Sequence, residues 1–104
     1  MEEIRSESDF NDKTLTGNVL IQFSATWCGP CKTLSRTMEA VDAIYNDVTI
    51  YKVDVDVMNK ELLSEYNVRS VPKLVMFVGG YDVAEMVGSR PLAEIEQFIN
   101  ENKK

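Results

Sequence analysis

The sequence predicts an α/β fold in which helices cover both faces of a mixed sheet. In the first half of the chain, apolar strand-like segments alternate with helical ones, which favours parallel strands joined by right-handed crossovers. In the second half, Gly79-Gly80 separates two strand-like segments and indicates an antiparallel hairpin. With 104 residues, the chain has the length of a single domain, expected over residues 1–104.

The N-terminal segment is expected to hold a short strand and a small helix. Residues 4–5 are assigned to the strand. Ser8 is expected to cap the helix, because serine is a favoured N-cap residue and an acidic residue follows it. Phe10 would face the core, and the helix would end at Leu15, before a turn.

A buried strand and a long helix are predicted next. Residues 19–23 are apolar and β-prone at nearly every position, as in a strand covered on both faces. The helix starts from Cys28, and apolar residues recur along it at spacings of three and four. This stripe consists of Cys31, Leu34, Met38, Val41 and Tyr45.

Residues 48–55 read as the following strand, again rich in β-branched residues. Asn59 is then expected to cap a short helix that runs through Tyr66. Asn67 is expected to end that helix in the left-handed conformation, which asparagine tolerates better than most residues.

The C-terminal part is predicted to be a hairpin followed by a helix. The hairpin joins strands at residues 74–78 and 81–87, the second of them at the edge of the sheet. Pro91 is placed at the first helical position, and residues 100–104 are expected to fray. The apolar face of this helix consists of Leu92, Ile95, Phe98 and Ile99.

Both cysteines of the chain lie in Trp27-Cys28-Gly29-Pro30-Cys31-Lys32, where a strand gives way to a helix. Free N–H groups and the helix dipole at that position favour the thiolate of Cys28. Cys31 lies one turn further along, with its β-carbon about 5–6 Å away, so the two can form a disulfide. Gly29 allows close approach of a partner, and Pro30 suits the first turn.

Composition argues against several other functions. A structural zinc site needs four ligands, and the chain offers two cysteines and no histidine. A structural disulfide across so short a loop would stabilise the fold little. The net charge of −6 argues against nucleic-acid binding, and no run approaches the roughly 20 apolar residues of a membrane span.

The stretch Phe23-Ser24-Ala25-Thr26-Trp27-Cys28-Gly29-Pro30-Cys31-Lys32 resembles the active-site stretch of the thioredoxin family, and the resemblance covers essentially the whole chain. It implies five strands in the order 1-3-2-4-5, flanked by four helices. It also implies a protein-disulfide reductase that uses its own disulfide and no other cofactor or metal. Cys28 would attack a target disulfide, Cys31 would resolve the mixed disulfide, and a thioredoxin reductase would return electrons.

The resemblance implies roles for further residues. Trp27 would form a flat wall beside Cys28. Pro72 would be a cis proline facing the dithiol, and the backbone of Val71 would pair with an extended target peptide. Gly88 would lie at the rim of the same groove, where a side chain would obstruct the target. An ordinary packing role for Trp27 and a simple strand end at Gly88 remain alternatives.

Gln22 and Lys73 depart from the family pattern, and the change at Gln22 also affects Lys52. Gln22 occupies the place of a buried aspartate that is thought to move the proton of the inner cysteine. Lys52, which commonly partners that aspartate, therefore lacks its partner and could equally be a surface-reaching strand lysine. Lys73 replaces a threonine after the proline, so we expect a cation near the groove that favours acidic targets, or else a solvated charge.

Two other functions compete with a reductase. A disulfide oxidase or isomerase of the same fold is disfavoured by Gly29-Pro30, which is the reductase form of the motif. A non-catalytic binding subunit would use the same groove and stays open. The acidic N-terminus lacks the apolar segment of a signal peptide, so we expect a monomeric electron carrier in a reducing cytoplasm.

Overall fold

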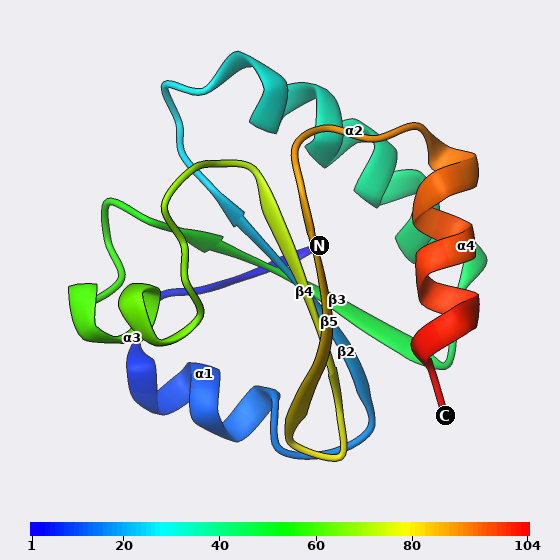
Figure 1. Cartoon of the computed structure of the whole chain (residues 1–104), viewed down its shortest axis with the longest axis horizontal. Coiled ribbons are helices and arrows are strands. Elements are labelled where there is room, and N and C mark those ends of the chain that lie inside the picture. Colours follow the sequence, from blue (N-terminus) through cyan, green and yellow to red (C-terminus); the bar gives the residue numbers. More distant parts are fainter.

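The sheet of five strands has the order β1-β3-β2-β4-β5 in the computed structural model, which describes residues 1–104 (Figure 1). The strands are β1 (Glu2–Ile4), β2 (Asn18–Ser24), β3 (Val48–Asp54), β4 (Lys73–Val78) and β5 (Tyr81–Val87). The helices are α1 (Glu7–Lys13), α2 (Gly29–Ile44), α3 (Lys60–Glu65) and α4 (Leu92–Asn102). The predicted α/β class, strand order and helix number are thus confirmed.

The strand directions follow from the connections. β1 and β2 each pair with β3 in parallel, with α1 in the connection from β1 to β2 and α2 in the connection from β2 to β3. β4 is antiparallel to both β2 and β5. Gly79 and Gly80 join β4 to β5 with φ angles of 58° and 91°, which only glycine adopts readily. The predicted hairpin is therefore present.

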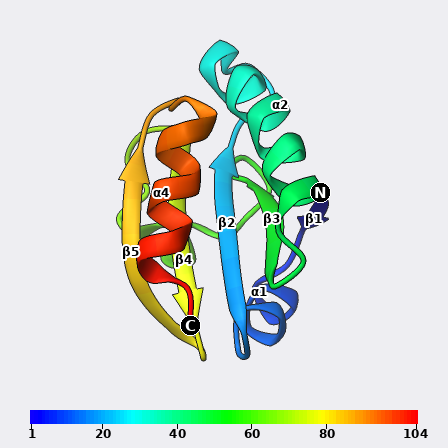
Figure 2. The ribbon, with the colours of Figure 1, turned by 90° about the vertical axis from the view of Figure 1, so that its right-hand side faces the viewer.

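Helices α2 and α4 cover one face of the sheet, and α1 and α3 cover the other (Figures 1 and 2). Because successive side chains of β2 point to opposite faces, Leu20 packs with Leu34 and Met38 of α2, whereas Ile21 and Phe23 pack towards Phe10 of α1. β2 is buried on both faces, as its composition predicts. None of the four helices is long and apolar enough to cross a membrane.

The start of α1 differs from the prediction. Ser6, not Ser8, is the N-cap: its backbone is extended, and its hydroxyl accepts a hydrogen bond from the N–H of Asp9 at 3.1 Å. β1 ends at Ile4, and the N-cap of α1 lies two residues earlier in the chain than predicted. Ser8 therefore lies inside the helix. The helix also ends before Leu15, whose side chain is exposed.

The C-terminus is held in place, contrary to the prediction that it frays. The N–H of Lys104 donates to Oδ1 of Asn18 at 2.8 Å, and Nδ2 of Asn18 donates to the carbonyl of Lys104 at 2.9 Å. Lys103 forms an ion pair with Asp47 at 2.7 Å. Pro91 is the N-cap of α4 and not its first helical residue. Asn18 and Asp47, which hold the C-terminus, are distant from it in sequence, so local sequence patterns could not reveal these contacts.

Candidate redox site

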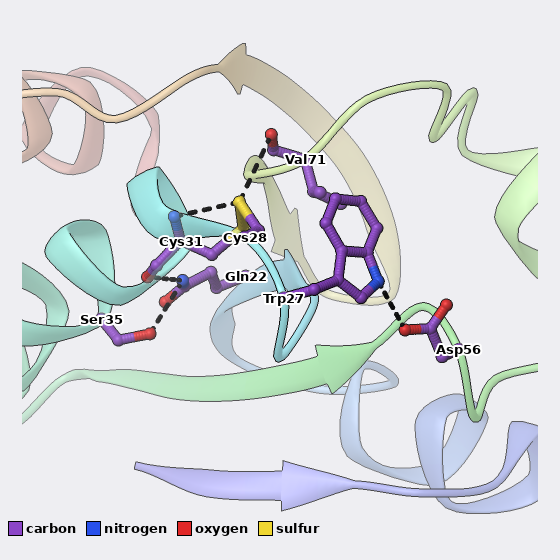
Figure 3. Close-up of a disulfide and its surroundings, with 7 residues drawn as sticks. All are labelled: Gln22, Trp27, Cys28, Cys31, Ser35, Asp56 and Val71. Carbon is purple, nitrogen blue, oxygen red and sulfur yellow. Dashed lines mark hydrogen bonds between the residues drawn. A yellow bond between two sulfur atoms is a disulfide. The ribbon is translucent and has the colours of Figure 1, made fainter.

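Cys28 is the N-cap of α2, at the point where the chain leaves β2 and turns into the helix (Figure 3). Its backbone is extended, with φ −95° and ψ 112°, and its sulfur accepts a hydrogen bond from the N–H of Cys31 at 3.1 Å. A sulfur in this position faces the unpaired N–H groups of the first turn. The predicted seat of the attacking thiol at a helix N-terminus is therefore present.

Cys28 and Cys31 form a disulfide across the first turn of α2, with their α-carbons 5.3 Å apart. Cys31 is 1% exposed and Cys28 is 6% exposed, whereas Gly29 and Pro30 between them are open to solvent. Cys28 is thus the outer sulfur and Cys31 the inner one. This asymmetry gives an incoming disulfide access to Cys28 first.

The loop before β4 lies against the outer sulfur. The Val71–Pro72 peptide bond is cis, and the carbonyl oxygen of Val71 is 3.9 Å from Sγ of Cys28 (Figure 3). That sulfur carries a hydrogen to donate only when the disulfide is reduced. Gly88 donates its N–H to the carbonyl of Pro72 at 2.9 Å and has a φ of 91°, so a glycine suits this position. Val71, Pro72 and Gly88 therefore lie together.

Trp27 is 69% exposed, so its ring is a surface feature rather than a packing residue. Its Nε1–H donates to Oδ2 of Asp56 at 2.8 Å (Figure 3). Asp56 is itself held, because its N–H donates to Oδ1 of Asp54 at 2.8 Å. Sequence reasoning missed Asp56, whose only signal was a carboxylate just beyond the end of a strand.

Gln22 of β2 lies beneath the disulfide and is completely buried (Figure 3). Its Nε2 donates to the carbonyl of Cys31 at 3.3 Å and to the hydroxyl of Ser35 at 3.1 Å. Its Oε1 has no hydrogen-bond partner. The amide thus ties the first turn of α2 to the sheet. Ser35 was missed by sequence reasoning, although it follows Cys31 by one helical turn.

A polar cavity of about 420 Å³ opens beside this buried amide. Lys52 lies in its wall and forms no ion pair, consistent with the loss of an acidic partner at position 22. The complete lining is Glu3, Ser24, Ala25, Thr26, Lys32, Ser35, Lys52 and Asp54. Ser35 therefore links the cavity to Gln22.

Lys73 does not lie near the groove, so that expectation is wrong. Its side chain is only 3% exposed and lies on the side of the sheet that α3 covers. It donates to the carbonyls of Tyr66 at 2.9 Å and Asn67 at 3.1 Å, and pairs with Glu85 at 3.2 Å. The reason is that β4 begins at Lys73, and strand alternation places its side chain on the same face as Val75 and Phe77.

No group of three or more histidine, cysteine, aspartate or glutamate side chains is arranged to hold a metal ion.

Comparison with protein-family models matches residues 2–101 to the thioredoxin family. Among characterised proteins, the chain is 37% identical over 103 residues to thioredoxin from Chlamydia trachomatis, covering 99% of this chain and 100% of that protein. It is 35% identical over 102 residues to thioredoxin-2 of Saccharomyces cerevisiae, covering 96% of each.

Solved structures agree with the sequence relatives. Plasmodium falciparum thioredoxin superposes with a TM-score of 0.89 at 26% identity, covering 97% of this chain and 98% of that one. The oxidised form of mitochondrial thioredoxin 3 from Saccharomyces cerevisiae also gives a TM-score of 0.89 at 26% identity, covering 98% and 95%. The likeness thus extends over the whole fold.

Proposed function

The chain belongs to the thioredoxin family, and we propose that Cys28 is the attacking thiol and Cys31 the resolving thiol of its reaction. As a member, it is a thiol–disulfide oxidoreductase that reduces target-protein disulfides with its own cysteine pair and no separate cofactor. The observation that carries the assignment of roles is the Cys28–Cys31 disulfide across the first turn of α2, with Cys28 outermost.

In the first step, the Cys28 thiolate attacks one sulfur of a target disulfide. The target's S–S bond breaks, its second sulfur leaves as a thiolate, and a mixed disulfide forms between Cys28 and the target. The N–H groups at the start of α2 favour the thiolate because they face the sulfur. Gly29 and Pro30 support the site by keeping this first turn open to a large partner.

In the second step, Cys31 loses its proton and attacks the sulfur of Cys28. The bond between Cys28 and the target breaks, the target sulfur that was bound to Cys28 leaves as a thiolate, and the Cys28–Cys31 disulfide forms. Two electrons have then passed to the target. Gln22 supports this step by holding the carbonyl of Cys31, and Lys52 lies in the polar cavity nearby.

Target docking is assigned to the surface around the outer sulfur. The Val71 backbone would pair with an extended target segment, as in strand addition, and Pro72 and Gly88 would shape the groove. Trp27, exposed and held by Asp56, would supply a flat apolar wall. Lys73 is not part of this assignment because its ammonium is buried on the other side of β4.

We also propose an electron donor, a compartment and an oligomeric state for the protein. A thioredoxin reductase is the expected electron donor, since disulfide exchange leaves the chain oxidised after each turnover. We place the protein in a reducing cytoplasm as a monomeric electron carrier with one domain over residues 1–104. The single domain and the monomer are supported by the sheet, whose two faces are both covered by helices of the same chain.

The test is reduction of insulin disulfides with dithiothreitol as electron donor. We expect the native chain to accelerate insulin precipitation, and Cys28→Ser to lose at least about 100-fold of that rate because the nucleophile is gone. Reduced Cys31→Ser, separated from dithiothreitol before insulin is added, should instead form a covalent mixed disulfide with insulin, visible by mass spectrometry. A Cys28→Ser chain as active as the native one would overturn the assignment.

Neither alternative function is favoured. A disulfide oxidase would equilibrate with glutathione near the oxidising end of the known range of potentials, so a titration against glutathione buffers separates it from a reductase. A purely non-catalytic subunit would keep its biological role after both cysteines are changed to serine.

A further inference from the structure

Lys73 carries a buried charge for which the disulfide chemistry has no use. Lysine ammonium has three N–H donors, and here three acceptors surround it: the carbonyls of Tyr66 and Asn67, and the carboxylate of Glu85. The lysine side chain is 3% exposed, whereas that of Glu85 is 57% exposed. A buried charge must be paired and hydrogen-bonded, and Lys73 meets this condition.

Two of the acceptors are backbone groups that the end of α3 leaves unpaired. Asn67 adopts the left-handed conformation with φ 59°. Its N–H donates to Ser64, and the N–H of Val68 donates to Leu63, which together form a Schellman motif. That motif satisfies carbonyls inside the helix but not those of Tyr66 and Asn67. The ammonium of Lys73 satisfies both.

The same contacts close the loop that faces the disulfide. Residues 67–72 connect α3 to β4 and end in the cis Val71–Pro72 bond. Lys73 directly follows Pro72, the last residue of this loop, and its ammonium donates to the carbonyl of Asn67, the first residue of the loop. The other end is held by the bond from the N–H of Gly88 to the carbonyl of Pro72. Both ends are therefore fixed to β4 and β5.

We propose that Lys73 is a positioning residue for protein-disulfide reduction: its buried ammonium holds the 67–72 loop closed, so that the Val71 backbone stays in place to receive an extended target. This inference rests on the proposed docking role of Val71. It predicts an effect on macromolecular targets that need the backbone of Val71, and little effect on small disulfides that need only the sulfur of Cys28.

The test compares Lys73→Met with the native chain on two substrates. Methionine has nearly the same length and no donors. We expect kcat/KM for insulin to fall about tenfold, mainly through KM, and the rate constant with the small aromatic disulfide 5,5′-dithiobis(2-nitrobenzoate) to fall less than twofold. Lys60→Met is the matched control, because Lys60 is exposed on α3 and its loss removes the same charge. It should match the native chain on both substrates.

Two further variants keep the inference testable. Glu85→Gln retains both carbonyl contacts of Lys73, so its KM for insulin should stay within twofold of the native value. If Lys73→Met does not fold, Lys73→Gln takes its place, because its shorter amide cannot span both carbonyls, and the same split between substrates is expected.

The outcomes distinguish this inference from the proposed function. Equal losses on insulin and on the small disulfide, or no loss on either in a folded Lys73 variant, would overturn the positioning role. A lower melting temperature with an unchanged KM would show that Lys73 only caps α3. A native chain that cannot reduce insulin would instead overturn the proposed function.

Discussion

Gln22 puts a neutral amide directly beneath the resolving cysteine. It is completely buried, it donates to the carbonyl of Cys31, and its oxygen is unpaired. An amide does not titrate, so it can hold the first turn of α2 but cannot accept the thiol proton of Cys31. Deprotonation of Cys31 must therefore proceed without a buried carboxylate at this position.

A carboxylate at position 22 should change the pH dependence of the second step. For Gln22→Asp, we expect resolution of the mixed disulfide to show an added inflection between pH 6 and 9, because burial raises the pKa of a carboxyl group. The measurement is the rate at which target thiol is released from a preformed mixed disulfide. Gln22→Asn is the control, since it shortens the side chain equally without a titrating group. Superimposable profiles for the Asp and Asn variants would contradict the prediction.

At the residue scale, the sequence predicted the reactive cysteines better than the residues that surround them. The pairing of Cys28 with Cys31 was predicted correctly because their motif is short and specific, and the cis bond before Pro72 was predicted from the family resemblance. Lys73 was misplaced because it was assigned to the loop, whereas it is the first residue of β4 and its side chain shares a face with Val75 and Phe77. Asp56 and Ser35 join the site through contacts that no local pattern encodes.

Among the elements, α1 gives the sharpest test of what begins a helix. Ser6 and Ser8 are both plausible caps in the sequence, but only Ser6 has extended backbone and a hydrogen bond to the N–H of Asp9. We expect Ser6→Ala to lower the free energy of unfolding by about 1 kcal/mol, because one N–H of the first turn loses its partner. Urea denaturation measures this directly.

Ser8→Ala serves as the internal comparison for that measurement. Ser8 lies inside α1 and is exposed, so the substitution should change the free energy of unfolding by less than about 0.5 kcal/mol. If the two variants were equally destabilised, capping by Ser6 would not explain where the helix begins.

Element type was more predictable than element length. The stripe on α2, the cap at Asn59 and the glycine hairpin all followed from periodicity and turn chemistry. The C-terminus of α4 did not, since Lys104 is fixed by Asn18, a residue 86 positions away. Local propensity depends only on neighbouring residues in the sequence. The order of the C-terminus depends instead on tertiary contacts with a distant strand.

For the molecule as a whole, the C-terminal segment after α4 connects elements that are distant in sequence, because it binds residues at the start of β2 and just before β3. Lys103 pairs with Asp47, which directly precedes β3, and Lys104 pairs with Asn18 at the start of β2. The hydrogen bond from Lys103 holds the pKa of Asp47 below its ordinary value of 3.8. A depressed pKa means that the folded state gains stability from the charged carboxylate above pH 3.8, and loses it as the pH falls below that value.

Asp47→Asn should therefore be slightly less stable than the native chain at pH 7, and the difference in stability should be smaller at pH 2. Because the carboxylate is exposed, the difference in urea midpoint at pH 7 will be small. Parallel urea titrations at the two pH values provide the measurement. A midpoint difference that persists undiminished at pH 2 would show that the ion pair is not its source.

Trp27 is the only indole in the chain and directly precedes the outer sulfur. Disulfides quench the fluorescence of a nearby excited indole, whereas thiols do so far less, so emission from this ring reports whether the pair is oxidised. Because the ring is exposed and its Nε1–H is fixed on Asp56, its signal is free of contributions from other tryptophans or from a shifting hydrogen-bond partner. We therefore expect the emission of Trp27 to rise when dithiothreitol reduces the Cys28–Cys31 disulfide, and a fluorescence titration would measure this.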